Sequence, residues 1–240
     1  MSLKEIGKKA AAYFAIDKYV QNGQKIGIGS GSTITFAVER LAHKVIEEKL
    51  TVSCAPTSFQ AKLLILEYKL PLISLEENYE LDIAFDGADE VDKNLTMIKG
   101  GGGCHLQEKI IAYCTKKLII IADESKDSKE LGDNWKRGIP IEVIPLAYKI
   151  IQNAIETKFG GEAILRQAAN KMGPVVTDNG NFIVDWKFKA GQSNNWVEID
   201  RDLHMIPGMV ETGLFIDMAS EVFFGRSDGT VFIRTKNNFI

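Results

Sequence analysis

The stretch Lys25-Ile26-Gly27-Ile28-Gly29-Ser30-Gly31-Ser32-Thr33 decides the fold class. It predicts a short apolar strand over 25–28, a glycine turn with hydroxyl groups, and then a helix over 33–48. A strand, a short turn and a helix form the repeating unit of α/β folds. Because glycine admits positive φ and a helix N-terminus carries partial positive charge, this turn is suited to an oxyanion or a phosphate.

Two common nucleotide-binding patterns do not describe this turn. A dinucleotide-binding turn has a third glycine where this chain has Ser32, and no acidic residue clearly ends a second strand at the usual spacing. A P-loop has a lysine after its last glycine, whereas Gly31 is followed by Ser32 and Thr33. The turn therefore predicts an anion site of another kind, in which Ser30, Gly31, Ser32 and Thr33 offer hydroxyls and amides.

Carboxylates cluster where another predicted strand, 81–86, ends. The strand runs directly into Asp86-Gly87-Ala88-Asp89-Glu90-Val91-Asp92. Ligands of open α/β sheets bind outside the carboxyl ends of the strands, so Asp86 and Asp89 are a candidate pair. A calcium loop is the first alternative, but the spacing lacks the twelve-residue pattern and its terminal glutamate. Glu90 and Asp92 are expected to cap the turn or to face solvent.

Four glycines, Gly100 to Gly103, separate Lys99 from an amphipathic helix that carries Glu108 in its first turns. Such a run exposes backbone amides to an anion, with a cation before it and a possible base after it. A flexible loop explains the glycine run equally well when the run is considered alone. The flanking Lys99 and Glu108 favour a site.

The remaining pattern predicts two domains. Alternation of helices and strands continues over helices 3–20, 57–68 and 106–116 and strands 51–55, 71–74, 81–86 and 118–122. After residue 132 the order becomes strand 139–144, helix 146–158, strands 162–168 and 181–188, helix 194–203 and strand 209–216, which is the β-α-β-β-α-β order of a ferredoxin-like unit. A hairpin over 221–233 is expected to rejoin the first domain.

We therefore predict an α/β protein. A parallel-rich, three-layer Rossmann-like sheet domain is expected from residues 1–132 plus 212–240, with a smaller ferredoxin-like α+β domain from residues 133–211.

Composition is that of an ordinary enzyme-sized chain. It has 240 residues, 45% of them hydrophobic, and a net charge of −3, which gives no electrostatic reason to expect nucleic acid. Cys54, Cys104 and Cys114 show no metal-ligand spacing, so we expect thiols in a reducing compartment. An apolar signal core and a run of roughly 18 apolar residues are both lacking. A cytoplasmic protein without membrane contact is the prediction.

Taken together, the three loops resemble the ribose-5-phosphate isomerase type A family. Its motifs occur here as GSGST at 29–33, DGADE at 86–90 and KGGGG…QEK within 99–109. Further agreement lies at 121–126, 140–145 and 175–181, and the resemblance extends from about Lys9 to the 213–215 segment. One departure is His105-Leu106, where the family suggests Leu-Thr or a similar pair; the spacing from Lys99 to Glu108 is unchanged.

The resemblance implies an enzyme that interconverts D-ribose 5-phosphate and D-ribulose 5-phosphate through an enediolate, without metal or organic cofactor. It implies Glu108 as the proton acceptor, with Lys99 at the enediolate oxygen. Asp86 and Asp89 would bind sugar hydroxyls, help to open the ring and shuttle protons. Substrate contacts would come from these residues and from Ser30, Gly31, Ser32, Thr33, Gly87, Ala88, Gly100, Gly101, Gly102, Lys126 and Lys9.

Two other classes of function stay open at this point. One is another enzyme on a related scaffold, such as an amino-sugar-phosphate deaminase or a CoA transferase. The other is a sugar-phosphate sensor that binds without turnover. We also expect a homodimer or homotetramer, built partly through residues 135–210. His43 and His204 are expected to be ordinary surface or packing residues.

Overall fold

The computed structural model describes residues 1–189 and 195–236. The chain divides into two compact units. The large unit comprises Met1–Ala88, Gln107–Asp127 and Asp217–Ile240, and the small unit comprises Asp89–Leu106 and Ser128–Ile216. Residues 89–106, 128–132 and 212–216, which the sequence pattern placed in the larger domain, belong to the small unit.

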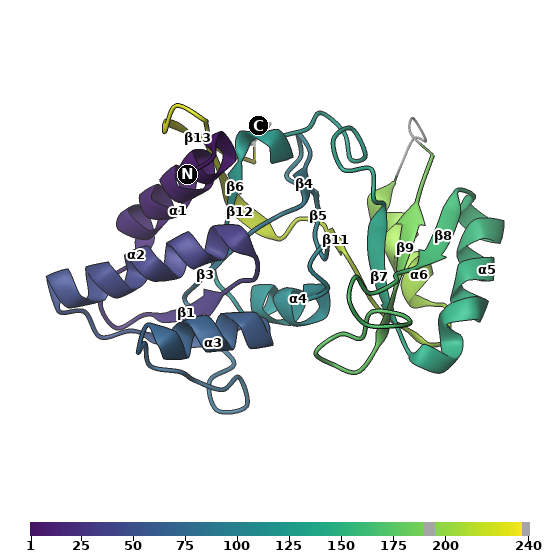
Figure 1. Cartoon of the computed structure of the whole chain (residues 1–240), viewed down its shortest axis with the longest axis horizontal. Coiled ribbons are helices and arrows are strands. Elements are labelled where there is room, and N and C mark those ends of the chain that lie inside the picture. Colours follow the sequence, from purple (N-terminus) through teal and green to yellow (C-terminus); the bar gives the residue numbers. More distant parts are fainter. Residues whose placement is uncertain (190–194, 237–240) are drawn as a thin grey trace. The chain divides into compact units, whose positions relative to one another are not determined.

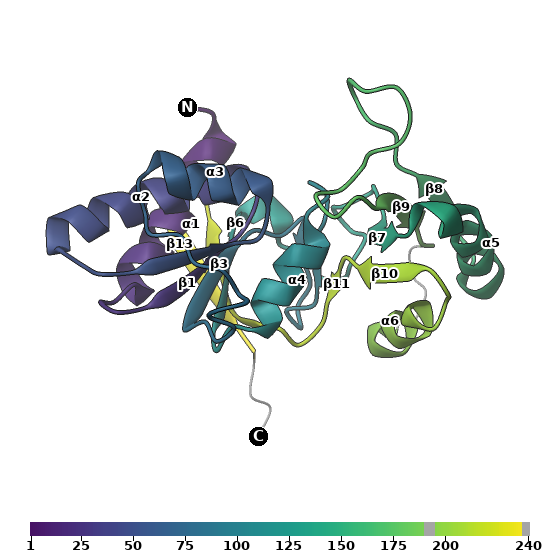
Figure 2. The same cartoon turned by 90° about the horizontal axis from the view of Figure 1, so that it is seen from below.

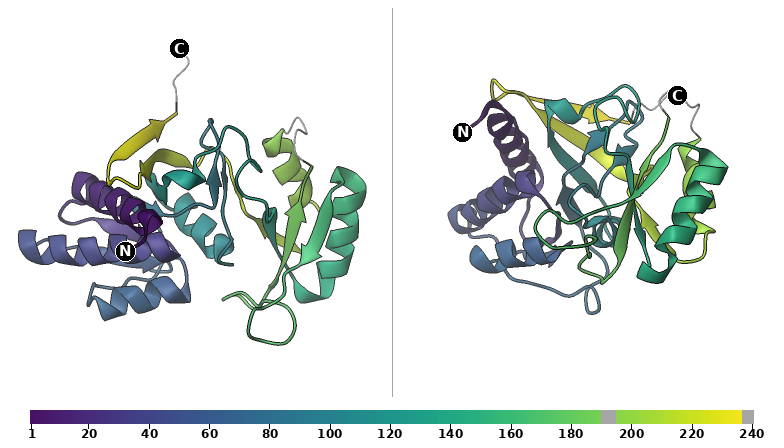
Figure 3. Two further views of the ribbon diagram at one scale, coloured as in Figure 1. Left: turned by 45° about the horizontal axis from the view of Figure 1, so that its top comes forward. Right: turned by 45° about the vertical axis from the view of Figure 1, so that its right-hand side comes forward.

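The large unit is built on a six-stranded sheet (Figure 1). Its strands are β1 (Lys25–Ile28), β2 (Ser53–Pro56), β3 (Ile83–Asp86), β6 (Leu118–Asp123), β12 (Ala219–Gly225) and β13 (Val231–Thr235), in the order β13-β12-β6-β3-β1-β2. All neighbours are parallel except β12 and β13, which form the expected hairpin at one edge. The C-terminal hairpin is drawn in yellow in Figure 3.

Helices cover both faces of this sheet, so the predicted three layers are confirmed (Figure 2). The helices are α1 (Leu3–Tyr19), α2 (Ser32–Glu48), α3 (Phe59–Glu67) and α4 (His105–Tyr113). Ile26 and Ile28 share a core with residues of α1, α2 and α3. Position 27 faces the opposite side of the sheet, since a Cβ on Gly27 would lie 2.6 Å from the Cγ2 of Ile111 on α4. Strand residues alternate between faces, and glycine lets α4 approach closely.

The small unit contains the predicted ferredoxin-like fold. Strands β7 (Ile139–Val143), β8 (Glu162–Leu165), β9 (Phe182–Lys187) and β10 (Met209–Thr212) alternate with α5 (Tyr148–Phe159) and α6 (Trp196–His204). Their order, β10-β7-β9-β8, is fully antiparallel. Ile139, Ile141 and Val143 share one core with residues of α5 and α6, so both helices cover the same face of the sheet.

A three-stranded sheet in the small unit was not predicted. It has the order β11-β5-β4 and consists of β4 (Glu90–Val91), β5 (Met97–Ile98) and β11 (Leu214–Phe215). The predicted strand 209–216 is therefore two strands in different sheets. The predicted strand 71–74 was also wrong: in the described chain it is an isolated parallel bridge between Leu72 and Cys54.

Glu90 corrects another expectation, because it neither caps the turn nor faces solvent. Its side chain is 0% exposed. Oε2 accepts a hydrogen bond from Gly132 N at 2.6 Å, and Oε1 accepts from Ser128 Oγ at 2.7 Å and from Asn134 N at 2.6 Å. These bonds attach the loop after residue 127 to β4. Asp92, in contrast, does cap its turn, by accepting from the amides of Asn94 and Thr96.

Within the described residues, no helix is long and apolar enough to cross a membrane.

Candidate active site

The carboxyl edge of the large unit's sheet brings together three predicted segments. Strands β1, β3 and β6 are parallel neighbours and end at Ile28, Asp86 and Asp123. The glycine turn, the DGAD turn and a short 3₁₀ helix, η1 (Glu124–Lys126), therefore all begin at the same edge. This is the edge at which open α/β sheets bind ligands.

Asp86 holds the glycine turn in place. The residue is 3% exposed, and its Oδ1 accepts hydrogen bonds from Ser30 N at 3.1 Å and Gly87 N at 2.7 Å. A Cβ at Gly29 would lie 2.1 Å from this oxygen, so only glycine fits there. Gly31, with φ of 101°, then turns the chain into α2 as its N-cap. The turn therefore presents the positive end of α2 beside a fixed carboxylate.

Four further residues at this edge were not among the predicted site residues. Ser30 Oγ lies 2.8 Å from Thr57 Oγ1 and donates to Ser58 Oγ at 2.6 Å. Gly31 N donates to Gln60 Oε1 at 2.8 Å, and Lys8 Nζ donates to Ser32 Oγ at 2.9 Å. Thr57 and Ser58 lie here because they follow the carboxyl end of β2. The predicted strand 51–55 could have indicated this, since the carboxyl ends of parallel strands lie at the same edge of a sheet.

The two predicted phosphate lysines have different surroundings. Lys9 Nζ lies 3.7 Å from Glu39 Oε1 and 4.8 Å from the Tyr13 ring centroid, so in this structure it contacts α2 and its own helix. Lys8, the preceding residue, is the one that contacts the glycine turn. Lys126 is half-buried in η1, where Asp123 Oδ1 accepts hydrogen bonds from both the amide and the hydroxyl of Ser125.

Glu108 also belongs to the large unit. It lies in the first turn of α4 and is 6% exposed. In the sequence it follows the last glycine of the run by five positions. A carboxylate that is buried on a regular helix is held in one orientation, which a proton-transferring group requires.

The glycine run itself belongs to the small unit, together with Asp89. Gly100 and Gly103 have φ of 96° and 83°, which favours glycine at both positions, and Gly103 N donates to Gly100 O at 2.9 Å. Gly101 N donates to Asp89 Oδ2 at 2.6 Å. A Cβ at Gly101 would approach Asp89 Oδ1 to 2.6 Å, so the close contact between backbone and carboxylate depends on glycine.

Lys99 is 2% exposed. Its backbone N donates to Gly213 O at 2.9 Å, and its Nζ lies 5.2 Å from the Phe215 ring centroid. The backbone bond and the three-stranded sheet fix where Lys99 leaves β5. His105 is 0% exposed and packs against the run, because a Cβ at Gly100 would come within 2.6 Å of its Nδ1. The His105 departure from the family pattern is therefore a packing residue beside the glycines.

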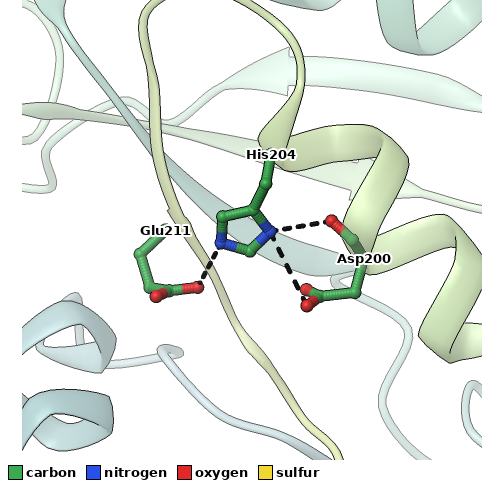
Figure 4. Close-up of side chains that lie close together, drawn as sticks. All are labelled: Asp200, His204 and Glu211. Carbon is green, nitrogen blue, oxygen red and sulfur yellow. Dashed lines mark hydrogen bonds and ion pairs between the residues drawn. The ribbon is translucent and has the colours of Figure 1, made fainter.

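A histidine flanked by two carboxylates lies elsewhere in the small unit (Figure 4). His204 Nε2 lies 2.9 Å from Glu211 Oε1, while Nδ1 lies 2.7 Å from Asp200 O and 3.6 Å from Asp200 Oδ2. Ligand-type atoms of these three residues lie within 4.8 Å of one another. However, the two carboxylates approach opposite ring nitrogens, which suits a doubly hydrogen-bonded imidazolium better than one shared metal ion.

His204 makes stability depend on pH. The hydrogen bond to Glu211 is the largest cause that raises the pKa of His204 above its ordinary 6.5, and partial burial opposes it. Stabilisation by the charged ring is therefore complete below the unfolded pKa and is lost as pH rises through the higher folded pKa. We expect less than about 1 kcal/mol, because the ring is over a third exposed. Urea midpoints of wild type and His204→Gln should differ at pH 6 and converge at pH 8.5; His43→Gln, on an exposed helix face, is the control.

Comparison with known proteins gives consistent matches. Residues 53–229 match the family described as ribose 5-phosphate isomerase A (phosphoriboisomerase A). A ribose-5-phosphate isomerase of Homo sapiens is 56% identical over 98% of this chain and 75% of its own length. One from Dictyostelium discoideum is 54% identical over 95% of this chain and 97% of its own.

Two solved structures have the same fold. Ribose 5-phosphate isomerase A from Methanocaldococcus jannaschii has a TM-score of 0.88 and 44% identity, and covers 95% of this chain and 98% of its own. A D-ribose-5-phosphate isomerase in complex with phospho-erythronic acid has a TM-score of 0.91 and 40% identity, over 98% of this chain and 100% of its own.

Proposed function

The chain belongs to the ribose 5-phosphate isomerase A family, and from that premise we propose that its own Glu108, Lys99, Asp86 and Asp89 interconvert D-ribose 5-phosphate and D-ribulose 5-phosphate. The observation that carries the proposal is the pairing of family membership with retention of all four groups. Each of them is built into a regular element or a fixed turn. An amino-sugar-phosphate deaminase or a CoA transferase would have no need of this set.

Glu108 is assigned as the base. Isomerisation starts from the open-chain aldehyde, and Glu108 takes the proton from C2 while electrons move onto the carbonyl oxygen O1, giving the enediolate. The same carboxylic acid returns the proton to C1, and the proton on O2 moves to O1 as the ketone forms. Asp86 and Asp89 are assigned to ring opening and to the exchange between O1 and O2. Atoms and charge balance without an added reactant.

Lys99 and the amides of Gly100 and Gly102 are assigned to the developing negative charge on the enediolate oxygen, and the Gly101 amide is assigned to Asp89, because it donates to Asp89 Oδ2. Fixed donors aimed at such an oxygen lower the barrier because they need no reorganisation during the reaction. The solved relative with phospho-erythronic acid supports this assignment. An aldonic acid phosphate has a carboxylate where the enediolate has two oxygens, so a protein that binds it accommodates negative charge there.

The phosphate is assigned to the glycine turn, through Ser30, Gly31, Ser32 and Thr33. The N-terminus of α2 favours a dianion at this position. The proposal keeps Lys126, Lys9, Gly87 and Ala88 from the sequence-based set and adds Lys8. Gly31 N currently donates to Gln60 Oε1, so phosphate has to take the place of that side-chain oxygen.

The test is turnover of ribose 5-phosphate by the wild-type chain in D₂O, with the C2 proton followed by NMR. We expect ribulose 5-phosphate to form with exchange of that proton. Binding of the sugar phosphate without turnover would instead support a sensor, and turnover of an amino-sugar phosphate or of a CoA ester would support a related enzyme.

Lys8 is predicted to contribute more to phosphate binding than Lys9. Lys8→Met removes the cation that contacts Ser32, so KM for ribose 5-phosphate should rise about tenfold with kcat nearly unchanged. Lys9→Met is the comparison variant, and KM should rise less in it, because Lys9 contacts Glu39 and Tyr13. A larger KM effect from Lys9→Met would return the phosphate role to Lys9.

Self-association through the small unit is also part of the proposal. Apolar side chains near the start of α5 are strongly exposed: Ile144 at 49%, Leu146 at 92% and Ile150 at 63%. Exposed apolar patches of this kind mark association sites. We expect a dimer or tetramer by light scattering, shifted toward one chain by Leu146→Glu but not by Met172→Glu, an equally exposed residue at 92%. A wild-type mass of one chain at micromolar concentration contradicts this.

A cytoplasmic location stays a prediction, which rests on Cys54, Cys104 and Cys114 all being thiols.

A further inference from the structure

Arg166, the residue after β8, is a buried arginine in contact with the glycine run. The residue is 8% exposed. Its Nη1 donates to Gly100 O at 3.0 Å and to Gly101 O at 3.2 Å. Its Nε donates to Asp185 Oδ2 at 2.8 Å, and Nη2 donates to the other oxygen of Asp185 on β9. The guanidinium thus bridges the ferredoxin-like sheet and two carbonyls of the glycine run.

One peptide unit of the run is held at both ends. In a trans peptide the carbonyl of one residue and the N–H of the next point in opposite directions. Arg166 binds the carbonyl of the 100–101 peptide, and Asp89 Oδ2 accepts from the amide of the same peptide at 2.6 Å. Arg166 is therefore connected to Asp89 through a single peptide group.

This connection has an electrostatic direction. A cation at the carbonyl end polarises the peptide and strengthens the N–H as a donor, which favours a negatively charged carboxylate at the other end. The second carbonyl that Arg166 binds, that of Gly101, belongs to the peptide whose N–H is on Gly102. Gly102 N–H is therefore directed away from Arg166 as well. The Gly102 amide is assigned to the enediolate oxygen, and the Gly101 amide to Asp89.

We propose that Arg166, oriented by Asp185, is a positioning residue for the isomerisation. It fixes the 100–101 and 101–102 peptides so that Asp89 stays oriented and charged and the Gly102 amide points toward the enediolate. The inference rests on the proposed function, because it assigns a task within that reaction. Arginine is suited to this role because its planar guanidinium has three nitrogens. Two of them bind the carboxylate and the third binds both carbonyls, whereas lysine offers a single point charge.

Several charged and titratable groups of the small unit lie close to Asp89 or to the peptide that it binds. They include Arg166 through the peptide, Asp185 bound to Arg166, Lys99 directly after strand β5, the adjacent Glu90, and His105 packed on Gly100. A variant that changes Arg166 and Asp185 together leaves the other three groups as they are.

The test is the double variant Arg166→Met/Asp185→Asn. Both buried charges are removed together, so neither is left uncompensated and the chain can still fold. Asp185→Asn alone keeps the guanidinium on the two carbonyls. Arg166→Lys keeps the positive charge but loses the planar guanidinium and its several donors. Lys187→Met is the matched control, because Lys187 also lies on β9 but has an exposed ion pair with Glu162 at 3.4 Å.

For the double variant we expect kcat to fall about thirtyfold with KM changed less than about threefold, since groups assigned to the transition state lose their orientation. The acid limb of the kcat profile should move to higher pH, because Arg166 no longer polarises the Gly101 N–H, which then favours the charged form of Asp89 less strongly. Asp185→Asn and Arg166→Lys should both fall between wild type and the double variant, because each keeps a cation at residue 166, and Lys187→Met should match wild type.

Amide hydrogen exchange of Gly101 supplies a readout that does not depend on activity. We expect faster exchange in the double variant than in Asp185→Asn. An unchanged pH profile with a loss of kcat equal in Arg166→Lys and the double variant would overturn the proposal, as would unchanged exchange at Gly101. An inactive wild type would overturn the proposed function instead, and the exchange rates would still decide whether Arg166 holds the peptide.

Discussion

Glu108→Gln should lower kcat for ribose 5-phosphate isomerisation by about a thousandfold, the scale at which a positioned base contributes. Gln has the shape of Glu and cannot accept the C2 proton, so exchange of that proton in D₂O should fall by the same factor. KM should change little, because the carboxylate acts on the barrier rather than on phosphate binding. The measurement is kcat, KM and the rate of C2 exchange on protein whose thermal unfolding is cooperative.

Glu67→Gln is the control for this change. It removes the same charge from an exposed helix position on α3, and it should leave kcat within about twofold of wild type. If Glu108→Gln keeps both turnover and exchange, the isomerase assignment stands and the base has to be Asp86 or Asp89. If exchange persists while turnover is lost, Glu108 is needed only after the enediolate has formed.

Local patterns predicted most of the fold. The helices over 3–20 and 33–48 and the parallel strands of the large unit follow from apolar periodicity and glycine turns, and the ferredoxin-like order follows from the spacing of elements after residue 132. What the sequence pattern missed depends on pairing between distant residues. Strands β4, β5 and β11 have two residues each and, among the described residues, form a small sheet of their own, so no periodicity reveals them.

Gly213 explains why the predicted strand 209–216 was split. Its N donates to Pro140 O on β7, and a Cβ there would lie 2.2 Å from Lys99 O. The chain passes at Gly213 from one sheet to the other, and the close backbone approach requires glycine. A glycine inside an apolar strand pattern was the available signal.

The candidate site, too, has one part that local motifs predict and one part that depends on contacts between distant residues. Its glycine turns and carboxylates are contiguous motifs and could be recognised in the sequence, whereas Lys8, Thr57 and Arg166 contact them from other elements. The prediction for Glu90 was wrong because a charged residue in a turn motif is usually exposed. Only the folded loop shows that four donors bind its carboxylate. Arg166 had no local motif at all.

Lys99→Met should lower kcat by about two hundredfold, within the range measured when one donor to a developing oxyanion is removed. Met fills similar volume and Lys99 already lies near the Phe215 ring, so the variant should fold. Affinity for phospho-erythronic acid should fall by a similar factor, because that compound carries the negative oxygens of the intermediate, whereas KM for ribose 5-phosphate should change far less.

Lys93→Met is the matched control for Lys99→Met, since Lys93 is exposed in the turn between β4 and β5. Its kcat and inhibitor affinity should equal those of wild type. A loss of kcat in Lys99→Met without weaker inhibitor binding would mean that the ammonium moves a proton rather than stabilising charge. Equal losses of inhibitor and substrate affinity would place Lys99 at the phosphate. Only a parallel loss of kcat and inhibitor affinity fits a cation at the enediolate oxygen.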